Sequence, residues 1–479
     1  MSESLVRPVL VIGVSGATWD VLRPLMQTGR TPCISRLLER GCGATLTSVK
    51  APGDRHFRPQ VAWPSIATGC LPERHGVTRF FHEAQEVLEP ALWDIFAQEG
   101  LSSGIYGWPG TWPPKPIKGF IVPSHLARDT RTWPPSLSDI KALDRWQQLS
   151  ERGGGVGGNR LAGAISSARI LTKYGLRPQT LAAMAGSAPS MLFGRVESRR
   201  LLLRRTKLEM SVDMFIRLAR LHQTSFSAFV TFYVDFVSHR YWRYRNPELF
   251  ETAPNPEQQL YASAVDDAYV ALDRAVGRLV TAVGDHAVIA LVSEHGMAPE
   301  PVSAEMGAWH YLIRASRVRE LAGLDERLEP CPVARWVAFR PVDAVSSASV
   351  AERLRRIEVL ETGLPLFRVY EHRDEVVIKL ALDNEVPRYA TGDLESLTVR
   401  IGGQTVPFTE IARRFGRQRS AMHAADGILV LAGPNIRRGS WLPSASVLDV
   451  APTLLRAAGL ACDARFDGRL LDVFERGPP

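Results

Sequence analysis

The stretch AFVTFYVDFVSHRYW, residues 228–242, determines how the rest of this chain is interpreted. Its first half is an apolar run that predicts a buried strand. Directly after this run, Asp235 and His239 follow four residues apart. A carboxylate and an imidazole are ligand types that divalent metals use, and open α/β sheets place their active sites at strand ends. The stretch therefore indicates a metal site on an α/β sheet.

Two more histidines stand next to strand-like runs. His295 lies in SEHG, directly after AVIALV (287–292), and His423 shortly precedes GILVLAGP (427–434). Taken singly, a His or Asp at a strand end is usually a turn or cap residue. Because metal-ligand types recur beside three predicted strands, we expect these side chains to converge on one cation.

The order of the predicted elements is typical of a parallel sheet. The strand PVLVIGV (8–14) is followed by a Ser-Gly turn and by the helical segment ATWDVLRPLMQ (17–27). A long helix leads into the strand at 287–292, and its apolar positions step by three and four residues. These positions are Val265, Tyr269, Leu272, Val276, Leu279 and Val283. We expect a doubly wound, mostly parallel α/β sheet flanked by helices.

Two regions interrupt this alternation of strands and helices. Residues 126–221 contain the Gly-rich run GGGVGG and then mostly helical, Arg-rich sequence, and residues 306–414 mix helix with strand-like pieces. The expected metal ligands lie on both sides of each region. We therefore interpret both regions as cap-forming insertions into a single α/β core, which consists of residues 1–125, 222–305 and 415–479.

Composition limits the classes of partner. The net charge of +8 comes mainly from arginine, and the cluster RVESRRLLLRRTK (195–207) predicts a solvated helix face, with an anionic substrate or a membrane surface as the alternatives. Because no nucleic-acid-binding motif accompanies the charge, we expect a small anionic substrate and no nucleic acid. Five cysteines without a CxxC motif favour a reduced, cytoplasmic protein. No apolar run reaches the ~20 residues of a spanning helix, so we expect no transmembrane segment.

Six motifs, taken in order, resemble the alkaline phosphatase superfamily, specifically its type I phosphodiesterase and nucleotide pyrophosphatase branch. They are VIGVSGATWD (11–20), GRTPCISRLLERG (29–41), VAWPSIATGCLPERHGV (61–77), VDFVSHRYW (234–242), SEHG (293–296) and HAADGILVLAGP (423–434). The resemblance implies an alkaline-phosphatase-like core. It also implies a dinuclear metal site, usually zinc, that hydrolyses phosphate or related esters through a covalent intermediate on a Thr or Ser.

One metal site of the family carries over in full. In the family it consists of an Asp, a His four residues later and a distant C-terminal His, and Asp235, His239 and His423 match this pattern. The resemblance thus implies one divalent metal at these three residues, most readily zinc. Manganese and iron are also compatible with the ligand types.

The second metal site departs from the family pattern. Ser15 stands where the first carboxylate belongs, and the DHG motif has become Glu294, His295 and a glycine. The place of the nucleophile falls on Pro59, or on Arg58 if the alignment slides by one residue. A two-metal site needs anionic ligands, and neither Pro nor Arg offers the hydroxyl of the family's covalent chemistry. We therefore expect the second metal to bind weakly or not at all.

Three residues around the lost nucleophile are candidates for catalysis. His56 could act as an acid or base, Arg58 could contact an anionic group, and Ser65 could serve as a substitute nucleophile. Each also has a plainer interpretation, because loop side chains are usually solvated and Ser65 belongs, in the family pattern, to the helix behind the nucleophile.

Three functions remain open from the sequence. The first is a metal-dependent enzyme that acts on a phosphate-type or related ester without the usual covalent intermediate. The second is a catalytically inactive pseudoenzyme with a binding or scaffold role. The third is a redox enzyme with a two-His-one-carboxylate iron site, which the ligand types permit.

Overall fold

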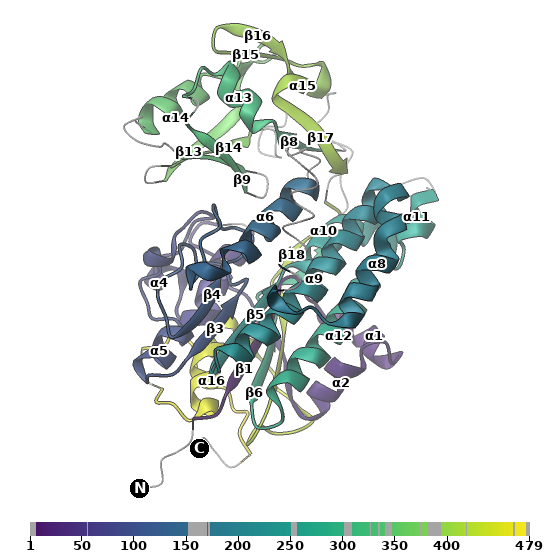
Figure 1. Ribbon diagram of the computed structural model, residues 1–479, viewed down its shortest axis with the longest axis vertical. Coiled ribbons are helices and arrows are strands. Elements are labelled where there is room, and N and C mark those ends of the chain that lie inside the picture. Colours follow the sequence, from purple (N-terminus) through teal and green to yellow (C-terminus); the bar gives the residue numbers. More distant parts are fainter. Residues whose placement is uncertain are drawn as a thin grey trace. The chain divides into compact units, whose positions relative to one another are not determined.

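The computed structural model of the protein divides into two compact units, Met1–Glu300 with Ser420–Pro479, and Pro301–Arg419 (Figure 1). The structure describes residues 6–54, 56–151, 170, 173–250, 256–300, 309–325, 327–333, 336–340, 347–372, 375–381, 394–417, 419–462 and 465–475. The GGGVGG run noted in the sequence lies outside these described residues.

The first unit is built on one large sheet. Its strands run in the order β20-β2-β19-β6-β1-β5-β3-β4, and β21 pairs with β2. The strands are β1 (Val9–Val14), β2 (Gly41–Thr47), β3 (Ser103–Tyr106), β4 (Gly119–Val122), β5 (Phe226–Thr231), β6 (Val288–Val292), β19 (Asp426–Ala432), β20 (Ser440–Trp441) and β21 (Ala445–Ser446). Strand β1 pairs in parallel with β5 and β6, whereas β19 is antiparallel to both β2 and β6. The prediction of a doubly wound, mostly parallel α/β sheet is confirmed.

Helices cover both faces of this sheet, which explains why β1 is apolar throughout. Leu10, Ile12 and Val14 belong to one buried cluster, while Val9 and Val11 belong to another on the opposite face. The first cluster includes α1 (Trp19–Gln27), α2 (Pro32–Glu39), α9 (Val196–Leu221), α10 (Tyr233–Arg245) and α12 (Ala264–Val283). The second includes α3 (Pro59–Thr68), α5 (Leu92–Gln98) and α16 (Val450–Ala458).

Two strands of this sheet differ from the sequence expectation. The strand predicted over 228–234 ends at Thr231, and α10 begins at Tyr233. Asp235 therefore lies in the first turn of a helix. The small-residue strand β2 was not predicted at all. Its glycines are required by packing, since a Cβ at Gly41 would lie 2.0 Å from the Leu431 carbonyl oxygen.

The Arg-rich region belongs to the first unit, and its described residues are mostly helical. It contributes α6 (Ser138–Glu151), α8 (Pro178–Phe193) and α9, and the second half of α9 packs into the core cluster. The remaining short elements of this unit are α4 (Pro72–His75), α11 (Pro256–Tyr261), β7 (Gly296–Pro299) and β18 (Ala421–Ala424). Whether residues 126–221 form a separate insertion stays a prediction.

The second unit has a hydrophobic core of its own. Its strands form two four-stranded sheets, β13-β14-β10-β9 and β12-β11-β15-β16, and a pair, β17-β8. They are β8 (Trp309–Ile313), β9 (Glu329–Val333), β10 (Trp336–Arg340), β11 (Glu358–Val359), β12 (Leu364–Pro365), β13 (Phe367–His372), β14 (Glu375–Leu380), β15 (Thr398–Ile401), β16 (Gln404–Pro407) and β17 (Ala412–Arg417), with helices α13 (Ala315–Leu321), α14 (Ser347–Arg355) and α15 (Phe408–Ile411). Across the described residues of both units, none of the helices combines the length and apolarity needed to cross a membrane.

Candidate metal centre

The candidate ligands come from three places in the first unit. Asp235 and His239 lie on successive turns of α10, which follows β5. His295 lies between β6 and β7, and His423 lies on β18. Strand β18 pairs antiparallel with β7, so that His423 stands opposite Met297. This pairing brings the C-terminal histidine to the end of β6, where His295 follows.

The ligand atoms of these residues lie close together. Asp235 Oδ1 is 3.3 Å from His239 Nε2 and 3.2 Å from His423 Nε2. The two Nε2 atoms are 2.9 Å apart. The ring of His295 stacks on that of His423 with centroids 3.9 Å apart. The ligand atoms of Asp235, His295 and His423 all lie within 4.8 Å of one another.

Backbone carbonyls fix the tautomer of all three imidazoles. A carbonyl oxygen can only accept a hydrogen bond, so each Nδ1 that faces one must carry the proton. The accepting oxygens for His239, His423 and His295 belong to Ala421, Phe57 and Gly296, at 2.6, 2.7 and 2.9 Å. In the neutral ring the Nε2 atom is then a bare acceptor, which is the form that binds a metal.

This arrangement fits a divalent cation. Asp235 Oδ1 and His295 Nε2 are buried and have no hydrogen-bond partner among the described residues. Bare nitrogens 2.9 Å apart, facing a carboxylate, repel one another unless a positive charge lies among them. Nitrogen and oxygen ligands of this kind suit zinc best and also suit manganese and iron.

Ionisation of Asp235 requires a positive charge among these residues. Burial opposes this ionisation, and positive charge on His239 and His423 holds the pKa of Asp235 well below the usual range. Burial, and next a positive charge on His423, lower the pKa of His295 well below its usual value. When both Nε2 atoms are bare, a bound cation would take the place of that positive charge.

Ser15 and Glu294 form a closed pair beside this group. Ser15 Oγ donates a hydrogen bond to Glu294 Oε1 at 2.5 Å, and both side chains are fully buried. Burial raises the pKa of Glu294 to about 8; the hydrogen bond from Ser15 opposes this shift, and the charge of Asp235 adds to it. Glu294 Oε1 also lies 3.3 Å from His295 Nε2. The pair therefore offers a neutral hydroxyl and a carboxyl group that burial keeps from ionising.

The loop before α3 contacts the candidate ligand His423 through a backbone carbonyl. Pro59 is the first residue of α3, and Arg58 caps the helix without a side-chain hydrogen bond. Arg58 instead pairs with Asp54 at 2.7 Å, and the side chain of His56 is exposed. Phe57, between the two candidates, accepts the hydrogen bond from His423 Nδ1. The loop is thus anchored to the ligands, while no hydroxyl stands at Pro59.

Ser65 lies in a closed polar contact inside α3. Its side chain is fully buried, and its Oγ is 2.8 Å from His75 Nε2. The Val77 N–H donates to His75 Nδ1 at 3.2 Å, so Nε2 carries the proton and donates to Ser65. Burial lowers the pKa of His75 to about 4. In this geometry His75 does not act as a base toward the Ser65 hydroxyl, and a catalytic role of Ser65 stays a prediction.

A mostly parallel sheet with imidazole and carboxylate side chains gathered where its strands end is typical of metal-dependent α/β proteins. The chain belongs to the type I phosphodiesterase / nucleotide pyrophosphatase family, whose model matches residues 9–388. Proteins of this family act on phosphoesters and depend on metal, typically zinc.

Among curated protein sequences, none matches this chain. Among solved structures, it is similar to human ectonucleotide pyrophosphatase/phosphodiesterase 5, with 13% identity over 97% of both chains and a TM-score of 0.45. Two structures of the murine protein of the same name are also similar. One, an inactive variant in complex with AMP, has 13% identity over 95% of this chain and 96% of that chain, with a TM-score of 0.44. The other has 14% identity over the same shares, with a TM-score of 0.42.

Proposed function

We propose that this protein is a phosphoester-acting metalloenzyme that holds one divalent cation, zinc in the first instance, at Asp235, His239 and His423. Its substrate is a small anionic phosphate-type ester. The observation that carries the proposal is the set of bare Nε2 atoms facing Asp235 Oδ1, each ring held by a hydrogen bond from Nδ1 to a backbone carbonyl. His295 supports the group by stacking on His423.

In this proposal the chain's own residues provide the ligands and hold them in position. When bound, a divalent cation supplies Lewis acidity toward an ester oxygen or an attacking water. Asp235 contributes the negative charge of the ligand set, and the Ala421 and Phe57 carbonyls orient the two imidazoles. Because Phe57 lies between His56 and Arg58, movement of that loop would be coupled to the ligands.

We infer that the reaction proceeds without a covalent intermediate on Ser or Thr. Pro59 has no hydroxyl to offer, and Ser65 is buried behind it with a proton donated to its oxygen. A water molecule is the remaining nucleophile. The closed Ser15–Glu294 pair likewise supports a single cation, since it lacks the two carboxylates of the family's second site.

The test is the metal content of the purified full chain. After exposure to zinc, manganese and iron, elemental analysis should give about one tightly bound ion per chain. His239→Ala and His423→Ala should each abolish this binding, whereas His286→Ala, a change at an exposed histidine of the same unit, should not. Two ions held with similar affinity, or none, would contradict the proposal. Iron in place of zinc would instead favour redox chemistry.

A pseudoenzyme is the second candidate function. It is favoured by Pro59 at the first position of α3 and by the buried Ser15–Glu294 pair, because together they leave the family's chemistry without its nucleophile and its second cation. A chain that binds one metal but turns over no phosphate, sulfate or phosphonate ester would support this candidate.

A further inference from the structure

Helix α8 is exposed although it carries no charged residue. Most of its described side chains face solvent, and Leu181 and Phe193 are 42% and 88% exposed. Val196, just beyond the turn that leads into α9, is 53% exposed. A helix whose outer side meets water normally carries charged residues there. The outer side of α8 therefore suits a surrounding that is less polar than water.

The inner side of α8 is anchored to the rest of the first unit. Asp213 on α9 accepts hydrogen bonds from the Arg177 N–H and from the Thr180 hydroxyl, at 3.2 and 2.6 Å. Asp213 also pairs with Arg278 on α12, and Met184 packs against the first core cluster. The helix thus has polar and apolar partners on one side, while its other side stays exposed.

Positive charge is concentrated in and around this helix. Residues 177–205 contain six arginines and a single acidic residue, Glu197, which gives this segment a net charge of +5 out of +8 for the whole chain. The Glu197 carboxylate is already paired with Arg200 and with Arg240 of α10. An anionic partner would therefore be attracted to the segment that contains the uncharged helix.

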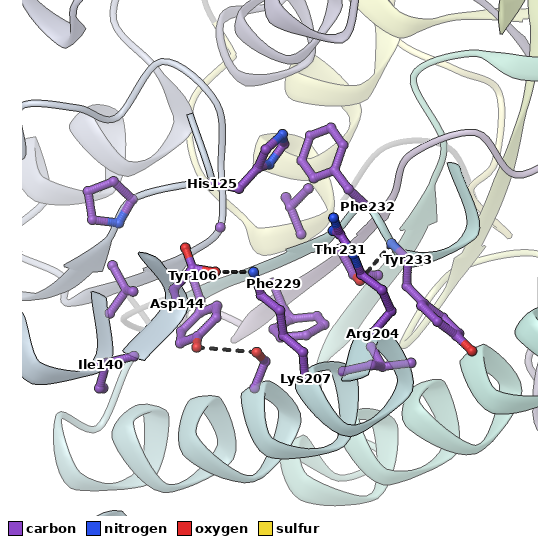
Figure 2. A pocket seen from close by; sticks show the side chains of 16 residues that line it. Tyr106, His125, Ile140, Asp144, Arg204, Lys207, Phe229, Thr231, Phe232 and Tyr233 are labelled. Atoms are coloured by element: carbon purple, nitrogen blue, oxygen red, sulfur yellow. Dashed lines mark hydrogen bonds and ion pairs between the residues drawn. The ribbon is translucent and has the colours of Figure 1, made fainter. Parts of the chain in front are cut away.

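Three basic residues of α9 face the interior of the first unit. Arg200, Arg204 and Lys207 follow one another at four and three residues, so they share one face of the helix. Arg200 is buried, and Figure 2 shows Arg204 and Lys207 among the side chains that line a pocket at the ends of β3, β4 and β5. Lys207 pairs there with Asp144. These three residues are not part of the outer surface.

Three other arginines lie away from that face. At 3.6 residues per turn, Arg199 and Arg205 are displaced from Arg204 by about 140° and about 100° around the helix axis. Arg195, which precedes the first residue of α9, and Arg205 are exposed, and Arg199 is half-buried. No ion pair joins any of the three to the part of the chain that the structure describes. Their charges are available to a partner.

We propose that α8 and the start of α9 bind the surface of an anionic phospholipid bilayer. In this arrangement α8 lies in the plane of the interface and does not cross the bilayer. Phe193 and Val196 enter the boundary between the headgroups and the acyl chains. Arg195, Arg199 and Arg205 meet the lipid phosphates. The inference goes beyond the proposed function and requires no metal.

A bilayer fits this surface better than a protein does. Leu181 and Phe193 are about 18 Å apart along the helix at 1.5 Å per residue, and the exposed side chains between them are small. A folded partner is recognised through a shaped, closely packed contact, whereas a bilayer requires no matching shape. A second copy of the chain, bound through the same surface, would bring the same arginines into one interface, and like charges disfavour such an association.

The test is cosedimentation of the full chain with lipid vesicles, in the presence of a chelator and at low salt. Vesicles of phosphatidylcholine alone are compared with vesicles that contain phosphatidylcholine and phosphatidylglycerol in equal amounts. We expect about a hundredfold tighter binding to the mixed vesicles, because each of three arginines near an anionic surface contributes about fivefold. The preference should fall as salt is added, since salt screens these charges.

An apolar variant locates the contact on the protein. Phe193→Ser should weaken binding to the mixed vesicles about tenfold, because less apolar surface enters the bilayer. Leu88→Ser is the matched control, since Leu88 is 72% exposed. Its backbone N–H donates to the carbonyl oxygen of His75, which contacts α3 on the other face of the sheet. This control should bind like the wild type.

A charge variant separates the three arginines from the net charge of the chain. The triple variant Arg195→Gln, Arg199→Gln, Arg205→Gln should lose the preference for the mixed vesicles. The matched control removes the same net charge from exposed positions elsewhere in the first unit and should keep the preference. It is the triple variant Arg36→Gln, Arg79→Gln, Arg438→Gln.

Three results would overturn the inference: no binding to either kind of vesicle, equal binding to both, or a Phe193→Ser variant that binds like the wild type. A dimer that forms without lipid and dissociates in Phe193→Ser, together with a failure to bind vesicles, would assign the surface to a second copy of the chain. Equal unfolding temperatures of the variants and the wild type show that a loss of binding is not a loss of folding. Because the experiment is carried out without metal, its outcome is separate from that of the proposed function.

Discussion

Replacing Asp235 by Asn should separate metal binding from folding stability. The Asp235 carboxylate lies 3.3 and 3.2 Å from the Nε2 atoms of His239 and His423. The amide of Asn keeps the shape, removes the negative charge and supplies an N–H that can be donated to one of these nitrogens. We therefore expect the metal-free variant to be at least as stable as the wild type, and to bind zinc poorly.

The size of the effect follows from linkage. A cation at about 1,000 times its dissociation constant raises the free energy of unfolding by about 4 kcal/mol. With an unfolding entropy of about 2.1 cal/mol/K per residue, the roughly 360 residues of the first unit correspond to about 0.75 kcal/mol per kelvin. Zinc should then raise the unfolding temperature of the wild type by about 5 °C. A hundredfold loss of affinity in Asp235→Asn would leave about 1.4 kcal/mol, or about 2 °C.

Scanning calorimetry in chelator and in excess zinc measures both quantities. Asp273→Asn is a matched control, because Asp273 is equally an Asp of the first unit, buried on α12, and accepts hydrogen bonds from the backbone N–H groups of Cys33 and Ile34 at 3.2 and 2.7 Å. It should lose stability under both conditions and keep the full zinc shift. A zinc shift in Asp235→Asn equal to that of the wild type would refute the ligand assignment.

Further outcomes follow from the residues beside the metal group. The triple change Ser15→Asp, Pro59→Thr and Glu294→Asp should raise the metal content from about one to about two ions per chain by elemental analysis; a normally folded variant that stays at one ion would show that these positions are wrongly assigned. Rapid quench with a labelled phosphodiester should trap no label on a Ser or Thr of the 56–68 segment of the wild type, and trapped label would reinstate covalent catalysis. Because burial lowers the pKa of His75 from 6.5 to about 4, the unfolded chain takes up this proton first as the pH falls. The free energy of unfolding should then drop by up to about 1.4 kcal/mol per pH unit between about pH 6.5 and pH 4. In His75→Gln, the free energy of unfolding measured by denaturant titration should depend less steeply on pH over this range.

The fold was predictable where strands are buried on both faces. Strands β1, β6 and β19 appear in the sequence as continuous apolar runs, because helices cover the sheet on both sides. Strand β2 has no such run. Its sequence GCGATLT contains glycines because the neighbouring strand packs closely against it: a Cβ at Gly41 would lie 2.0 Å from the Leu431 carbonyl oxygen. This close approach comes from a strand far away in the sequence, so no local pattern predicts it. The C-terminal end of β5 was also predicted wrongly, because the apolar run continues into the first turn of α10.

Only the side chains of the candidate site could be predicted from the sequence. Ligand types at strand ends could be recognised from spacing and from the family resemblance, and whether they hold a metal stays a prediction. The Ala421 and Phe57 carbonyls that orient His239 and His423 could not be recognised, because a backbone oxygen leaves no mark in a sequence. A pocket at the ends of β3, β4 and β5 was not predicted, for a related reason. Arg204 appeared in the sequence as one member of a charged helix face, and only the packing of α9 against these strand ends places it in the lining of the pocket.

The position of β19 between β2 and β6 affects the order in which this protein can be assembled during synthesis. In the described part of the chain, β2 pairs only with β19, β20 and β21, all of which follow residue 425. At 5 to 20 residues per second, about 380 residues are translated, over roughly 20 to 80 s, before β2 can meet its first partner. During this interval its edge is available to other chains. His423 is made only a few residues before β19, so the sheet and the candidate metal centre are completed together. The chain could therefore hold the proposed cation only after its last strands have been synthesised.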